Sequence, residues 1–184
     1  MKYKNLLAAI LMIALGVLSR TIWHIWPNVE LVTSIALLSA SNLSRKWMLL
    51  VIFSIMAISD LIIGNTNIFI FTWSAYLLFG LFVSFFLKKN TDGKKQLLQM
   101  TGWGIVSSVW FYLWTNFGVW LLDSFGMYQR TLTGLFASYI YAIPFFKFNL
   151  IGNIILVPLT FVIFYFIKDL ATSLLIQKKV RKTG

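Results

Sequence analysis

The chain lacks most of the side chains that carry catalytic and metal chemistry. Among its 184 residues it has no cysteine, one histidine and five acidic residues. The absence of cysteine excludes disulfides, iron–sulfur clusters and thiolate chemistry. A nucleotide-binding loop and the GxSxG and HExxH motifs are also absent. We therefore expect no enzyme activity, no cofactor and no metal site, and active transport would need a separate ATPase.

Charged residues are also scarce. Only 11% of the residues are charged, whereas a soluble domain carries about 25%. Hydrophobic residues make up 59% of the chain and the mean hydropathy is +0.82. No charge occurs from Asn5 to Ser19 or from Leu61 to Leu87. A helix of about 20 apolar residues crosses the hydrocarbon core of a bilayer, so the sequence predicts an all-α, polytopic membrane protein forming a single domain over residues 1–184.

Hydropathy and helix-breaking residues divide the chain into six apolar segments. We predict six transmembrane helices at about 5–20, 30–44, 47–64, 68–87, 97–115 and 148–170. The first segment resembles a secretory signal, but Arg20, Trp23 and His24 follow it where small residues would mark a cleavage site. We expect it to remain as a helix.

The basic residues predict the orientation in the membrane. Of the net charge of +11, most comes from clusters at 2–4, 45–46, 88–95 and 178–182. With six crossings, all four clusters fall on one side, which the positive-inside rule makes cytoplasmic. The sequence therefore predicts a cell-membrane protein with both termini in the cytoplasm, in contact with lipids rather than nucleic acid.

The segment 116–147 then lies outside and is the least regular part of the pattern. Its start interrupts an aromatic run, "WFYLWTNFGVWLLD", with Thr115, Asn116 and Gly118. The stretch 131–143 is apolar, yet a full crossing there would put the basic tail outside. We expect a helix that caps or re-enters the outer leaflet, and a chain break at Asn116 that lines a cavity or a buried turn.

Polar side chains at membrane depth are costly and are therefore candidates for function. Asp60, one turn from the end of the third predicted helix, is either a solute ligand or an interfacial acid paired with Arg20, Arg130 or Lys147. Arg130 either meets an anionic group of a ligand or anchors the chain at the interface.

Three asparagines leave similar pairs of interpretations. Asn116 is a ligand donor or a helix C-cap, and Asn28, after Pro27, is a ligand contact or a turn residue. Asn153 faces a cavity or bonds a neighbouring helix. Glu30 suits a helix N-terminus, where a carboxylate stabilises the dipole.

Aromatic residues are densest from 103 to 148, including Trp114 and Trp120. Aromatic walls with a few polar groups are typical of small-molecule pockets. We predict a solute site at the outer ends of the helices. Its predicted residues are Asn28, Asp60, Trp114, Asn116, Trp120, Arg130 and Asn153.

Ala36 and Ala40 form a small-x-x-x-small pair in the second predicted helix. Such pairs allow close helix approach. They serve either packing within the chain or docking of another membrane subunit.

Several blocks together resemble a known family. These are "PNVELVTSIALLSA" (27–40), "SDLIIG" (59–64), "TNFGVWL" (115–121), "YQRTLTGLFASYIYAIPFF" (128–146) and "LIGNIIL" (150–156). They look like a prokaryotic family of small integral membrane proteins, itself similar to the substrate-binding S components of energy-coupling-factor (ECF) transporters. The resemblance implies a six-helix S-component fold with a vitamin-sized ligand near the outer face. It also implies docking on a transmembrane coupling subunit with two ATPases.

Two functions follow from these expectations. The first is a substrate-binding component of a small-solute transporter. The second is a membrane scaffold whose polar residues lock the helices together in a solidly packed bundle without a cavity.

Overall fold

The computed structural model describes residues 2–23, 28–87, 93–123 and 126–183, with side chains placed from residue 5 to residue 174 within these ranges. All regular structure in the described residues is helical, as predicted. The elements are α1 (Lys2–Thr21), α2 (Val32–Asn42), α3 (Arg45–Ile63), α4 (Phe69–Phe86), α5 (Gly93–Leu122) and α6 (Leu132–Thr183).

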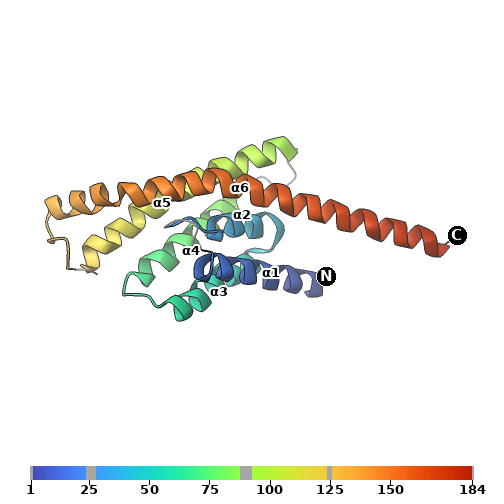
Figure 1. The fold of residues 1–184 in the computed structure, drawn as a ribbon, viewed down its shortest axis with the longest axis horizontal. Helices are drawn as coiled ribbons and strands as arrows, with labels where there is room; N and C mark the ends of the chain where they lie inside the picture. Colours follow the sequence, from blue (N-terminus) through green and yellow to red (C-terminus); the bar gives the residue numbers. More distant parts are fainter. Residues whose placement is uncertain (1, 24–27, 88–92, 124–125, 184) are drawn as a thin grey trace.

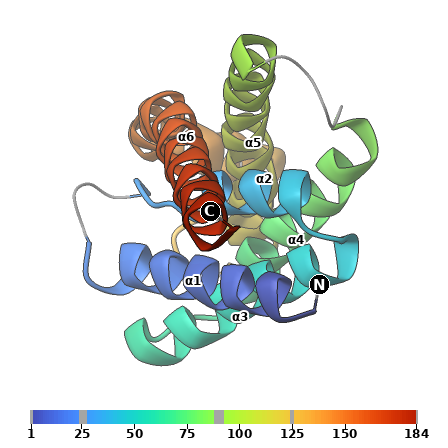
Figure 2. The same cartoon turned by 90° about the vertical axis from the view of Figure 1, so that its right-hand side faces the viewer.

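The short helix α2 forms the centre of the bundle. It contacts each of the other five helices, and every residue from Val32 to Ala40 is buried. Figure 2 shows α2 in the middle, with α1 and α3 on one side and α5 and α6 on the other. A helix that is apolar all round must be buried on all faces, which explains this position.

Four helices, α3 to α6, are long and apolar enough to cross a membrane. With eleven residues, α2 extends only about 16 Å, roughly half of the hydrocarbon thickness. The apolar part of α1, Asn5–Thr21, is also shorter than the other four. The prediction of six membrane spans with a separate capping helix is therefore wrong, although each predicted segment is helical.

The predicted break at Asn116 is also wrong, because α5 is one helix of 30 residues. The polar side chains bond to their own helix: Asn116 Nδ2 donates to the Tyr112 carbonyl at 2.8 Å, and Thr115 Oγ1 to the Phe111 carbonyl at 2.7 Å. Gly118 provides space rather than a turn. A Cβ added there would overlap the ring of Phe71 in α4, so the glycine allows the two helices to approach.

The capping helix predicted at 131–143 is instead the first part of α6, which continues for 52 residues through Pro144 and Pro158. Prolines are tolerated in such helices because neighbouring groups satisfy the freed carbonyls. The connection between α5 and α6 is short, and the two helices pack antiparallel as the most extensive pair in the fold.

Both chain termini lie at the same end of the bundle, and the α5–α6 connection lies at the opposite end (Figure 1). The C-terminal part of α6 extends past the other helices in the same view. Large apolar side chains are exposed on the outer faces of all helices that surround α2, for example Leu7, Phe53, Leu78, Val106 and Ile155. A lipid environment would cover such a surface.

Candidate functional site

A recess of about 370 Å³ lies between the halves of α5 and α6 next to their connection, and it is completed by Thr72 of α4 and by Asn28 in the segment before α2. We refer to this space as the recess throughout. Figure 1 shows the α5–α6 connection at the end of the bundle opposite the termini, and the recess is lined by residues on the halves of both helices next to that connection. Its lining consists of Asn28, Thr72, Ser108, Phe111, Tyr112, Thr115, Asn116, Val119, Met127, Tyr128, Tyr141, Ala142, Phe145, Phe146 and Asn149.

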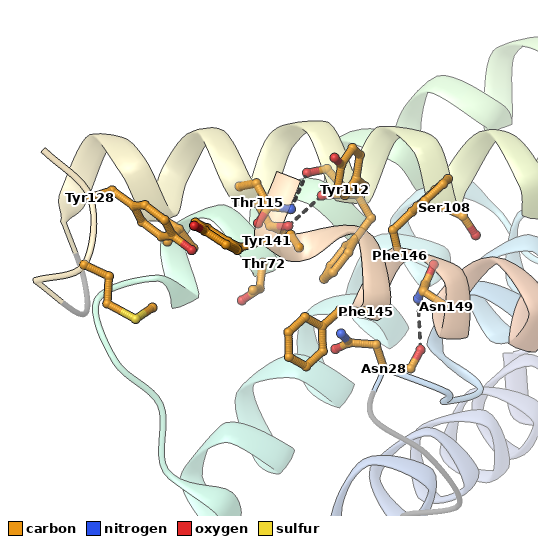
Figure 3. Close-up of a pocket in the computed structure, with 15 residues that line it drawn as sticks. Asn28, Thr72, Ser108, Tyr112, Thr115, Tyr128, Tyr141, Phe145, Phe146 and Asn149 are labelled. Atoms are coloured by element: carbon orange, nitrogen blue, oxygen red, sulfur yellow. Dashed lines mark hydrogen bonds between the residues drawn. The ribbon is translucent and has the colours of Figure 1, made fainter. Parts of the chain in front are cut away.

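Asparagine and serine side chains form one end of the recess. Asn153 Nδ2 donates to Ser108 Oγ at 2.8 Å and to Asn149 Oδ1 at 3.2 Å. Asn149 Nδ2 in turn donates to the Asn28 carbonyl at 3.0 Å, the bond drawn in Figure 3. Asn149, Asn153 and Ser108 are buried. This chain of bonds ties α5, α6 and the segment before α2 together at the polar end.

The wall that α5 contributes keeps one acceptor free. The amide nitrogen of Asn116 is used within the helix, while its Oδ1 accepts no hydrogen bond from any described residue. Ser138 on α6 donates to the backbone carbonyl of Asn116 at 3.3 Å. Asn116 therefore lines a cavity, but on a continuous helix and not at a break in the chain.

Two tyrosines brace α5 against α6 beside the recess. Tyr112 donates its hydroxyl to the Tyr139 carbonyl at 2.7 Å, and Tyr139 donates to the Leu113 carbonyl at 3.1 Å. Their rings lie 5.6 Å apart, and Phe146 lies 4.8 Å from Tyr112. These contacts keep the aromatic wall in place without filling the recess.

Tyr128 and Tyr141 lie at the end of the recess away from Asn149 (Figure 3). Neither hydroxyl bonds to any residue that the structure describes. The hydroxyls are therefore available to a ligand or to water.

Asp60 lies outside the recess, in a buried ionic network. Arg20 Nη1 donates to Asp60 Oδ1 at 2.9 Å, and Arg20 Nε to Glu30 Oε2 at 3.1 Å. Asn65 and Trp73 donate to the second oxygen of Asp60. Of the interpretations open for Asp60, the structure has the pairing with Arg20.

The carboxylate of Glu30 completes this network, since its second oxygen accepts from the Tyr76 hydroxyl at 2.9 Å. All four carboxylate oxygens of the two acids thus have a donor. A charge is costly to bury unless it is paired in this way. No cluster of three or more potential metal ligands occurs in the described ranges.

The remaining predicted residues occupy supporting positions. Trp114 donates to Ser74 Oγ on α4 at 2.9 Å, and Trp120 donates to the carbonyls of Gln129 and Thr131. These bonds position α4 and the α5–α6 connection. Arg130 is exposed and does not line the recess.

Ala36 and Ala40, the predicted docking pair, are 1% and 3% exposed. Both lie within the central helix α2 and pack inside this chain. Their spacing allows the close packing around α2 that the alternative interpretation described.

Of the seven predicted site residues, Asn28 and Asn116 line the recess, and Asn153 supports two residues that do. Sequence reasoning missed Ser108 and Asn149. The spacing of Asn149 and Asn153, four residues apart on one helix, could have indicated them, because such residues share a face.

Comparison with curated proteins and with solved structures gives no match. The family comparison names no ligand or partner for the recess. Residues 2–174 match the model of a family of unknown function (DUF6580), and the chain belongs to that family.

Proposed function

We propose that this protein is a membrane component that binds a small solute in the recess, as the substrate-binding part of a transporter. The observation that carries the proposal is the recess itself. Its volume of about 370 Å³ is within the range of small-molecule pockets, about 300–1,000 Å³. Its lining combines aromatic walls with a few polar groups, which is also typical of such sites.

Orientation supports the proposal. Arg45, Lys94 and Lys95 lie at the starts of α3 and α5, at the end of the bundle that holds the termini. Basic residues favour the cytoplasmic side. This orientation directs the recess and the α5–α6 connection toward the exterior, where a solute to be taken up would arrive.

The resemblance to ECF S components adds a mechanism to the proposal. A coupling subunit with ATPases would supply the energy that this chain has no motif to provide. Because Ala36 and Ala40 are buried, such a subunit would dock on an outer helix. The exposed apolar face of α1, with Leu7, Leu11 and Leu15, is one surface of that kind.

The scaffold alternative retains support at one place, the ionic network around Arg20, where every carboxylate oxygen is satisfied by the protein. A scaffold would need no space between α5 and α6, however. We therefore assign the network a structural role and the recess a binding role.

Filling the recess tests the proposal. Ala142 lines the recess and is buried, whereas its neighbour Ile143 is exposed and lines no part of it. We expect Ala142→Phe to lose a small molecule that the native protein retains after gentle extraction, and Ile143→Phe to keep it. Mass spectrometry of the intact complexes measures this and also detects co-purifying subunits. Equal retention by both variants, or no retained molecule in any of the three proteins, would contradict the proposal.

A further inference from the structure

The recess has no fixed charge on its walls. None of its described lining residues is Lys, Arg, Asp or Glu. The segments 24–27 and 124–125, which lie outside the described residues, contain none of these four residue types, and His24 is their one titratable residue. Glu30, two residues from Asn28, and Asp60 already pair with Arg20, and Asp123 of the α5–α6 connection does not line the recess.

This absence restricts the charge of a ligand. A carboxylate or phosphate in the recess would meet no cationic side chain among the described lining residues, and an ammonium group would meet no anion. Burying an unpaired charge is expensive. The same chain satisfies this requirement elsewhere, since its buried arginine is paired with two carboxylates.

The aromatic side chains indicate the shape of a ligand. Six of the lining residues are Phe or Tyr, contributed by α5, α6 and their connection. Aromatic rings prefer to pack against other rings in offset or edge-to-face geometry. Rings also attract cations, but no carboxylate lies among the described lining residues to pair with one. Arg130 and Lys147 are exposed and do not line the recess, so neither supplies a partner for an anion inside it.

The polar groups indicate hydrogen bonding without charge. Asn116 Oδ1 can accept a hydrogen bond, and the hydroxyls of Tyr128 and Tyr141 can donate or accept one. None of these atoms bonds to a described residue. Asn116 lines the α5 wall, and Tyr128 and Tyr141 lie at the end of the recess away from Asn149 (Figure 3). A flat ligand with polar groups at its edge would suit this arrangement.

We propose that the recess selects a neutral, flat, ring-containing solute with hydrogen-bonding groups at its edge, and rejects anions and cations of the same shape. This inference rests on the proposed function, because it concerns the ligand of the same recess.

The natural absence of cysteine allows a direct test. Val119→Cys introduces a single thiol on the α5 wall of the recess, and Thr133→Cys introduces one at the exposed start of α6, outside the recess. Each variant is reconstituted in lipid nanodiscs and reacted with N-ethylmaleimide. Three probes share one ring system and differ in charge: neutral indole-3-acetamide, anionic indole-3-acetate and cationic tryptamine.

We expect indole-3-acetamide to slow labelling of Val119→Cys at a concentration at least about tenfold below that required for either charged probe. A tenfold difference in affinity corresponds to only about 1.4 kcal/mol, which is small beside the cost of an unpaired buried charge. Labelling of Thr133→Cys should not respond to any probe. Protection by a charged probe at the same or a lower concentration, or no protection by any probe, would overturn the inference and leave the recess as a solute site. A thiol at 119 that does not react while the thiol at 133 does would show a closed recess and overturn the proposed function as well.

Discussion

Replacing Arg20 by methionine should destabilise the bundle more than replacing any exposed basic residue. Arg20 is 10% exposed in its side chain and pairs with Glu30, 19% exposed, and Asp60, 6% exposed. Arg20→Met keeps an apolar stem of similar shape but leaves two carboxylates without a cation. Removing one partner of a buried pair costs about 3–5 kcal/mol. The partial exposure of Glu30 favours the lower end of that range.

The matched control is Arg45→Met. Arg45 is exposed, donates to Ser84 at 3.1 Å and lies 3.9 Å above the Phe85 ring. Exposed ion and cation–π contacts contribute about 1 kcal/mol or less. The free energy of unfolding, measured by titrating detergent-solubilised protein with SDS and following circular dichroism, should therefore fall at least about 2 kcal/mol more for Arg20→Met than for Arg45→Met.

A second background separates charge from packing. In Glu30→Gln/Asp60→Asn, Arg20 is the unpaired buried charge, so adding Arg20→Met should be neutral or stabilising. The destabilising effect of Arg20→Met should thus disappear or reverse on the second background, a coupling that a double-mutant cycle measures. An equal loss of stability on both backgrounds would show that the arginine stem, and not its charge, holds the helices, and would refute this reasoning.

Two further substitutions test the packing around the recess by the same SDS titration. Gly118→Ala should lower the free energy of unfolding by about 1–3 kcal/mol, because the new Cβ would meet the Phe71 ring and overpacking costs that much. The control is Gly102→Ala, where an added Cβ meets nothing within 4 Å, and it should be neutral or slightly stabilising. Similar losses for both variants would contradict the close contact at Gly118. Asn153→Leu removes one hydrogen bond to Ser108 on α5 and one to Asn149 on its own helix. A bond between membrane helices contributes about 0.6 kcal/mol on average and a typical internal bond about 1 kcal/mol, so a loss of about 1 kcal/mol is expected, and no change would exclude a role in packing.

Hydropathy was sufficient to locate the helices but not to decide which of them cross a membrane. The segment around α2 is apolar because neighbouring helices cover all its faces. A membrane-spanning helix is apolar because lipid covers its outer face. Composition is the same in both cases. Only the tertiary contacts, in which α2 meets all five other helices, distinguish a buried half-length helix from a span.

The polar residues of α5 are unusual in an apolar run, but the chain break predicted from them is wrong. An asparagine in an apolar run needs partners for its amide. The sequence does not reveal that Asn116 satisfies its nitrogen on the preceding turn of the same helix, which leaves the helix intact where Asn116 lines the recess. Likewise Asp60 had three basic residues as candidate partners, and only the approach of α1 to α3 selects Arg20.

The ionic network contacts the recess at two places, the segment before α2 and the ring of Phe111. The buried charges therefore also help to position residues that line the recess. Glu30 pairs with Arg20 and lies two residues after Asn28. The carbonyl of Asn28 accepts a hydrogen bond from Asn149 at the polar end of the recess. Tyr76 on α4 also donates to Glu30, and its ring lies 4.9 Å from Phe111, a lining residue. Buried ion pairs are weak evidence for stability but can specify one arrangement of elements. Here that arrangement fixes α4 and the segment before α2 relative to each other, and the bonds of Asn149 and Asn153 then attach α5 and α6 to that segment at the polar end of the recess.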